Sequence, residues 1–186
     1  MAAGDLTTLA AFKSWGEITI SADDAVLSAA ITSMSAAITN YINRNIIEAT
    51  YSDVLNGMGG DALITRQTPV TAVSSLVIDG RTIPASPMPA LSGYRVSPHA
   101  IYLVGGSVFT RGVQNVAVAY TAGYPVVPAD IVQALNEWLN VVYKERDRVG
   151  YLSKSLAGET VSFDAKAMPS RVTTYLESWV RRVPIL

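Results

Sequence analysis

The sequence contains no cysteine and only one histidine, His99. Without cysteine the chain has neither disulfides nor thiolate metal ligands, and with one histidine a zinc site would depend on carboxylates. A serine hydrolase would need His99 as its base, and the Gly-x-Ser-x-Gly turn that presents the nucleophile in many hydrolases is missing. We therefore expect no catalytic residue, no metal site and no cofactor. We interpret His99 as structural or simply exposed, and the chain as a protein other than an enzyme.

Charge is also scarce. Only 16% of the 186 residues are charged and 49% are hydrophobic, and the mean hydropathy is +0.28. This composition fits either a compact monomer rich in alanine and valine or a subunit that buries much of its surface in an oligomer. We favour the oligomer, because the surface of a monomer usually carries more charge.

Long apolar runs are missing too. No uninterrupted run approaches the roughly 18 residues that a membrane span requires. The first residues, Met1–Phe12, lack the basic segment with which a signal peptide begins. We expect a protein that is made in the cytoplasm and has no membrane partner.

The charges that are present are unevenly placed. Residues 1–143 hold 6 Lys and Arg against 10 Asp and Glu, whereas residues 144–186 hold 8 against 5. A basic C-terminal part would suit docking on an acidic partner, although ordinary helix ends explain it equally well. The pI of about 5.8 and the absence of a Lys/Arg cluster beyond Arg181–Arg182 argue against tight binding of duplex DNA.

Apolar spacing predicts a bundle of about four helices. They are a short helix ending at Trp15, a long one over Ala22–Asn43, one over Pro128–Arg148, and one that starts at Met168. The long helix should bury a stripe of five side chains, and Ser21 should cap it. That stripe consists of Leu27, Ile31, Met34, Ile38 and Tyr41.

Between the second and third helices the pattern changes to about six short segments with β-branched residues and tight turns. Asp79–Gly80 is a strong hairpin signal, and Pro84–Pro98 is expected to form an extended or looping excursion. The predicted fold class is α+β: a small helical bundle with an inserted antiparallel β-sheet or small barrel. We assign residues 1–45 and 121–186 to the helical core and residues 46–120 to the insertion.

One stretch, Tyr120–Thr160, organises the rest. It contains YTAGY, then PADI, then ERDR, and the string SKSLAGETVSF begins within it and ends three residues beyond it. A well-formed helix here leads into a polar, glycine-containing segment without clear period, which indicates an irregular arm held out for a partner. Two further segments lie upstream of it, first LTTLAAFKSW and then QTPVTAVSSLVIDG.

The order and spacing of these segments resemble the head–tail connector (adaptor) family of tailed bacteriophages. The resemblance covers most of the chain and fails mainly over residues 81–114. It implies a structural virion protein in the neck, at the head–tail interface. It also implies a closed homo-oligomeric ring, expected to be a dodecamer, whose partners are the portal ring and a tail-side stopper or tail-terminator protein. DNA would pass through the ring transiently and without specific binding.

The resemblance further implies that the arm and the last helix contact the portal and neighbouring subunits. The residues expected at this interface are Arg148, Tyr151, Lys154, Ser155, Leu156, Glu159, Val161, Phe163, Trp179, Arg181 and Arg182.

Two other interpretations remain open from the sequence. One is a tail-completion or stopper-like ring protein, which would use the same apolar surface at the tail. The other is a ligand-binding or hydrolytic α+β domain, which predicts a monomer and a pocket with convergent polar groups.

Overall fold

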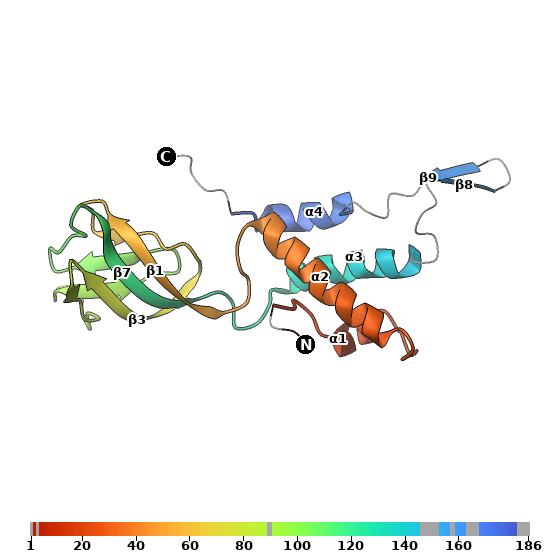
Figure 1. The fold of residues 1–186 in the computed structure, drawn as a ribbon, viewed down its shortest axis with the longest axis horizontal. Coiled ribbons are helices and arrows are strands. Elements are labelled where there is room, and N and C mark those ends of the chain that lie inside the picture. The colour runs from red at the N-terminus through yellow and green to blue at the C-terminus, as the bar shows by residue number, and fades with distance from the viewer. Residues whose placement is uncertain are drawn as a thin grey trace. The chain divides into compact units, whose positions relative to one another are not determined.

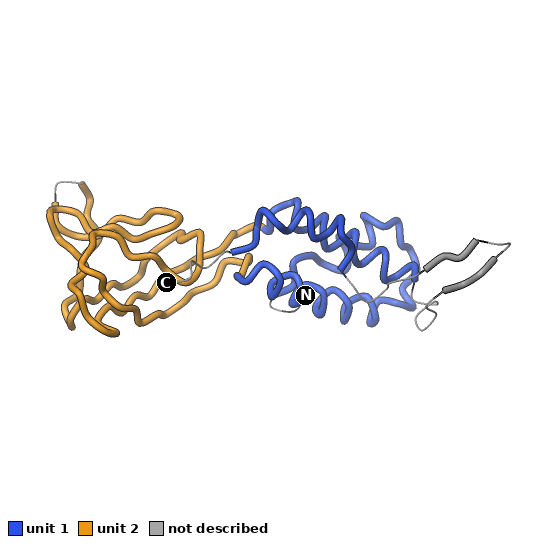
Figure 2. The backbone as a smooth tube through the Cα atoms, turned by 90° about the horizontal axis from the view of Figure 1, so that it is seen from above, with its two compact units in different colours: residues 1–44, 127–186 blue, residues 45–126 orange. Residues whose placement is uncertain are grey.

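The computed structural model describes residues 2, 4–88, 91–145, 153–156, 159–162 and 168–181. These residues form helices and antiparallel sheets (Figure 1), so the α+β prediction is confirmed. The chain divides into two compact units (Figure 2). Residues 1–44 and 127–186 make up the first, called here the helical unit, and residues 45–126 make up the second, the β unit.

The helical unit is built from α1 (Leu9–Trp15), α2 (Asp24–Ile42), α3 (Ala129–Glu145) and α4 (Ser170–Glu177). Helix α2 contacts the other three, and α3 also packs against α4. The third helix was expected to run to residue 148, but the residues after 145 lie outside the described part of the chain.

Polar side chains near the helix ends connect α1, α2 and α3. Thr8 caps α1, since its Oγ1 accepts a hydrogen bond from the Ala11 amide at 3.0 Å. The prediction that Ser21 caps α2 is wrong. The N-cap is Asp23, which makes no capping bond; instead its Oδ2 accepts from the Tyr143 hydroxyl of α3 at 2.8 Å. The acidic start of α2 thus serves tertiary contacts rather than the helix itself.

Helix α2 buries one face. Its six buried side chains are Leu27, Ile31, Met34, Ser35, Ile38 and Ile42. Tyr41, expected in this stripe, is 40% exposed, because four residues after Ile38 the 3.6-residue period brings Ile42 rather than Tyr41 to the core. By length and composition α2 could cross a membrane. A buried core helix meets the same two criteria, and α2 packs against three neighbouring helices.

The β unit contains two open sheets. Of the two forms predicted for the insertion, an antiparallel sheet or a small barrel, the structure has the sheet. The larger sheet has the strand order β1-β7-β3-β4 and the smaller one β2-β6-β5. The strands are β1 (Ala49–Gly57), β2 (Ala62–Leu63), β3 (Val70–Ile78), β4 (Arg81–Thr82), β5 (Gly93–Val96), β6 (Ile101–Val104) and β7 (Gly112–Ala122).

The core of the β unit lies on one face of β7. Val116, Val118, Tyr120 and Ala122 alternate along it and are each at most 1% exposed, as expected for a strand whose side chains point to opposite faces. The predicted hairpin at Asp79–Gly80 is confirmed: both residues have positive φ, 48° and 77°, and they join the paired strands β3 and β4.

One strand was missed. β5 lies within the proline-rich excursion and pairs with β6 from Gly93↔Val104 to Val96↔Ile101. Four residues are too few for a periodic signal, and the nearby prolines weaken a strand prediction. The arm was expected to be irregular, yet it contains a hairpin of β8 (Ser153–Leu156) and β9 (Glu159–Ser162).

Candidate assembly surfaces

The first candidate surface is the β8–β9 hairpin, which carries five of the predicted interface residues. Lys154 pairs with Val161, Ser155 with Thr160, and Leu156 with Glu159. The hairpin has only four residues in each strand, and an isolated two-stranded hairpin is at best marginally stable in water. Four further predicted residues lie outside the described part of the chain: Arg148, Tyr151, Phe163 and Arg182.

The second candidate surface is the turn after α4, which contains Trp179 and Arg181. The indole Nε1 of Trp179 donates to Asp130 Oδ2 at 2.6 Å, and the guanidinium of Arg44 lies 5.1 Å from the centre of the indole ring. The backbone N–H of Arg181 donates to the Ile42 carbonyl at 2.9 Å. The structure therefore brings these two predicted residues together, at a point that also joins α4 to α2 and α3.

Sequence reasoning missed the partners of this cluster. One partner is Asp130, in the first turn of α3, where its carboxylate also accepts from the Ile131 amide at 3.0 Å. The other is Arg44, which follows the C-cap residue Asn43 of α2. Because both meet Trp179 through tertiary packing, no spacing in the sequence could have revealed the cluster.

A polar seam continues along α3 and α4. Arg171 Nε lies 3.3 Å from Glu137 Oε2, and Glu137 Oε1 accepts from Gln133 Nε2 at 2.8 Å. The hydrogen bond to Tyr175, followed by the negative charge of Glu137, raises the pKa of Arg171. Arg171 is largely exposed, so this pair orients the two helices and adds little stability.

The β unit presents apolar side chains at the end of its larger sheet. Val113 is 82% exposed and Met58 is 67% exposed, and both line one shallow pocket with Arg111. Met58 lies in the glycine-rich segment Gly57–Gly60. The sequence could not show that Val113 points to solvent, since valine is among the residues most often buried.

Beside this surface a side-chain network fixes the neighbouring turns. Asp79 accepts from the Thr110 hydroxyl and from Asn115 Nδ2 at 3.1 Å. These hydrogen bonds favour the charged carboxylate and lower the pKa of Asp79. Asn115 also accepts from the Gly57 amide at 2.8 Å, so the network holds the end of the sheet in place.

Inside the β unit Tyr120 is only 1% exposed and lies between two strands. Its hydroxyl donates to Asp53 Oδ2 at 2.7 Å and accepts from the Gln67 amide at 3.1 Å. Burial, followed by the hydrogen bond to Asp53, raises the pKa of Tyr120 to about 12. A neutral phenol with two hydrogen-bond partners offers no acid or base near neutral pH. We therefore interpret these two hydrogen bonds of Tyr120, called here the tyrosine lock, as structural.

The described residues contain no group of three or more His, Cys, Asp or Glu side chains that could hold a metal ion. His99 lies exposed in the turn before β6.

The comparison with protein families gives one result: residues 5–183 match the head completion protein family. The comparison with curated proteins gives no significant match.

Solved structures share the fold over the whole chain. A chain from the neck of an empty gene transfer agent particle, computed with C6 symmetry, is 22% identical with a TM-score of 0.61, covering 100% of this chain and 95% of that one. A chain from the neck of the native particle, computed with C12 symmetry, is 23% identical with a TM-score of 0.58 and the same coverage. A chain of the native particle's virion is 22% identical with a TM-score of 0.60, covering 100% and 94%.

The family match spans nearly the whole sequence and agrees with the resemblance to head–tail connectors noted from the motifs. The chain belongs to the head completion protein family and is a structural protein of the virion rather than an enzyme.

Proposed function

We propose that this chain is the adaptor of the neck: copies of it form a closed ring on the portal, through which DNA passes to the tail. The observation that carries the proposal is the likeness, over the whole chain, to a chain of a neck computed with C12 symmetry. Twelvefold symmetry fits the dodecamer that the connector resemblance implies. In such a ring each subunit uses one face against the opposite face of the next, and the rotation closes.

In this proposal the helical core, residues 1–45 and 121–186, forms the ring body, and the β-rich insertion, residues 46–120, faces the tail side or braces the ring's outside. The low charge of the chain, 16% of residues, suits a subunit that buries surface against its copies. A tail-side stopper or tail-terminator protein would bind the ring's other end.

The arm would dock on the portal and on neighbouring subunits. A short hairpin with free edges adds readily to a sheet of another protein, because main-chain hydrogen bonds supply the affinity. The interface then includes the hairpin residues Lys154, Ser155, Leu156, Glu159 and Val161, the flanking residues Arg148, Tyr151 and Phe163, and Trp179, Arg181 and Arg182.

Passage of DNA requires a wall that does not hold phosphates. With 14 basic and 15 acidic residues and a net charge of −1, the chain lacks the excess of positive charge that releases counterions and binds duplex DNA. A ring of such subunits lets DNA slide.

The test mixes purified chain with the portal and images the product by electron microscopy. The intact chain should give a ring stacked on the portal. A chain lacking residues 150–167 should fail to dock while keeping its helical content in circular dichroism. Docking by the shortened chain at full strength would refute the role of the arm, and a ring found only on isolated tails would select the stopper-like alternative.

A further inference from the structure

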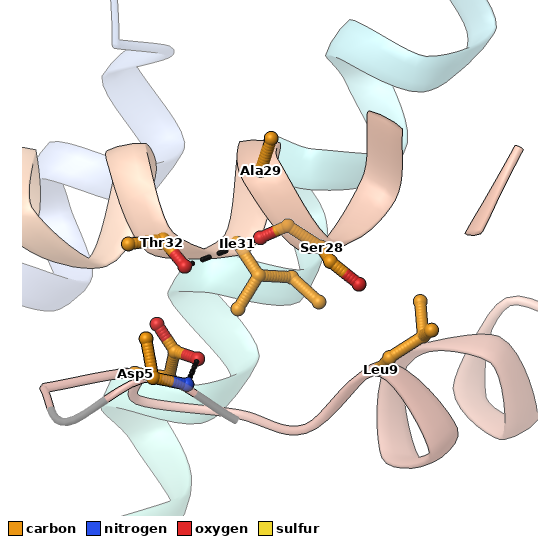
Figure 3. A pocket seen from close by; sticks show the side chains of 7 residues that line it. Asp5, Leu9, Ser28, Ala29, Ile31 and Thr32 are labelled. Carbon is orange, nitrogen blue, oxygen red and sulfur yellow. Dashed lines mark hydrogen bonds between the residues drawn. The ribbon is translucent and has the colours of Figure 1, made fainter. Parts of the chain in front are cut away.

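A pocket lies between the N-terminal segment and α2, within the helical unit. It measures about 270 Å³ and is lined by residues from three places: the chain start, α1 and α2. Figure 3 shows Asp5 and Leu9 on one side, facing Ser28, Ile31 and Thr32 on the other. The lining residues are Ala2, Asp5, Leu9, Ser28, Ala29, Ile31 and Thr32.

The carboxylate of Asp5 is the unusual group in this pocket. Asp5 is only 4% exposed, and its Oδ2 accepts from the Ala2 amide at 2.5 Å. Its Oδ1 is buried and has no hydrogen-bond partner in the described part of the chain. An unpartnered buried acceptor on a charged group is costly, and because most buried polar groups in folded proteins have a hydrogen-bond partner, this oxygen is a candidate acceptor for an incoming donor.

No cation of the helical unit's described residues serves Asp5. Lys13, on the neighbouring helix α1, pairs with Asp24 at 2.7 Å and also donates to the Ile20 carbonyl at 2.9 Å. The segment around Asp5 is itself held firmly, because the Leu6 amide donates to Ser35 Oγ at 3.1 Å in a buried contact. The carboxylate therefore stays in place without a partner of its own.

The other residues that line the pocket determine which ligand it can bind. Ser28 and Thr32 bring hydroxyl oxygens, and the Thr32 hydroxyl donates to the Ser28 carbonyl at 3.2 Å, which leaves its oxygen free to accept. Leu9 and Ile31 provide apolar contact. A cationic head with an aliphatic stem matches this combination, since lysine and arginine bury their stems while their heads donate hydrogen bonds.

The pocket can be reached from outside, because Ser28, Ala29 and Thr32 are exposed on α2. The chain also carries suitable cations of its own: residues 144–186 hold 8 Lys and Arg against 5 Asp and Glu, and residues 1–143 hold 6 against 10. Lys144, at the end of α3, is exposed and makes no ion pair within the described residues. An acidic receptor and a basic surplus on one chain are what a head-to-tail contact between copies requires.

We propose that this pocket receives a lysine or arginine side chain from a neighbouring copy of the chain, with Asp5 as its counter-ion. The proposal rests on the ring put forward above and names one of its subunit contacts.

The first test counts copies bound per portal by native mass spectrometry. Asp5→Asn should weaken ring completion by about tenfold or more per contact, since a hydrogen bond to a charged group is lost at every interface. Ser28→Phe fills the pocket from its rim and should do the same without touching the carboxylate. Glu17→Gln and Ser33→Phe are the matched controls, because both positions are exposed in the helical unit outside the pocket.

If Asp5→Asn lowers thermal stability, Ser28→Phe still decides the result. Full rings from both pocket variants would overturn the proposal while leaving the ring intact. Failure of the unaltered chain to bind the portal would instead overturn the proposed function.

The second test probes the chemistry of the pocket in the free chain. n-Butylammonium, which mimics the end of a lysine side chain, should shift the methyl resonances of Leu9, Ile31 and Thr32 in a saturable way. Neither n-butanol with the unaltered chain nor n-butylammonium with Asp5→Asn should do so. Equal shifts with the alcohol, or no shifts with the amine, would show that the pocket does not select a cation.

Discussion

The two units differ in how completely they satisfy their own polar groups. Three buried side-chain atoms lack a hydrogen-bond partner in the described residues, and all three lie in the helical unit. They are Asp5 Oδ1, Arg44 Nε and Asn136 Oδ1. The described β unit has none, and its polar groups close into networks around Tyr120 and Asp79. A unit that leaves such groups open is the one expected to be completed by other subunits.

The β unit is incomplete in a different way. Its exposed apolar side chains, Val113 and Met58 foremost, lie at the surface rather than in the core. Exposed valine or methionine costs the folded unit little, whereas a buried unpaired carboxylate costs more. The comparison therefore predicts a helical unit that gains stability on assembly and a β unit that is already stable alone.

The largest expected effect separates the two cores. Leu135→Ala in α3 and Leu76→Ala in β3 each remove a fully buried leucine and should each lower the free energy of unfolding by about 2–5 kcal/mol. All three tryptophans, Trp15, Trp138 and Trp179, belong to the helical unit, so their fluorescence reports that unit during urea titration. Leu135→Ala should shift this transition, and Leu76→Ala should leave it in place. Equal shifts for both would mean that the units unfold as one.

A smaller effect is expected from the tyrosine lock. Tyr120→Phe leaves Asp53 and the Gln67 amide without their partner and should destabilise the β unit by about 1–3 kcal/mol. Tyr102→Phe is the matched control, since Tyr102 is 42% exposed. Far-UV circular dichroism during urea unfolding measures both. Equal midpoints for the two variants would contradict the lock.

Alkaline pH provides a reversible version of the same test. The pKa of Tyr120 is raised from 10.0 to about 12 in the folded chain, so the folded state holds the phenol proton more tightly than the unfolded state. This contribution to stability is complete below pH 10 and is lost as the pH rises from 10 to 12. The β-unit midpoint should fall over that range, and less steeply in Tyr120→Phe. A parallel fall in both proteins would assign the loss to other groups.

The smallest effect concerns the cluster after α4. Trp179→Phe keeps a ring under the Arg44 guanidinium but removes the Nε1 hydrogen bond to Asp130. Because Asp130 is exposed, the loss should be only about 0.5–1.5 kcal/mol of the helical unit's stability. Thermal unfolding of Trp179→Phe beside Asp130→Ala, which removes the acceptor, measures it. A loss in Trp179→Phe that Asp130→Ala does not share would show that the indole stabilises the unit through another contact.

The sequence predicted those parts of the fold that repeat along the chain. The spacing from Leu27 to Ile38 located α2, and the Asp79–Gly80 pair located a hairpin, because each depends on local geometry alone. Ser21 was chosen as a cap on the same local basis, and there tertiary contacts of Asp23 decided otherwise. Helix propensity and capping are weak where side chains have better partners elsewhere.

The candidate surfaces were only partly predictable. The arm stood out because its composition changes after the third helix, but its hairpin did not, since four-residue strands give little periodic signal. The Asp5 pocket was not predicted. A carboxylate that is buried without a partner is a property of packing, and no pattern in one sequence reports it.

One measurement tests the central claim most directly: native mass spectrometry of the purified chain mixed with the portal. The proposal predicts a single complex with 12 copies of the chain on each portal, a number that would match the C12 symmetry of the neck whose chain shares this fold. A chain that stays monomeric beside the portal, or that binds it one copy at a time without closing, would contradict it.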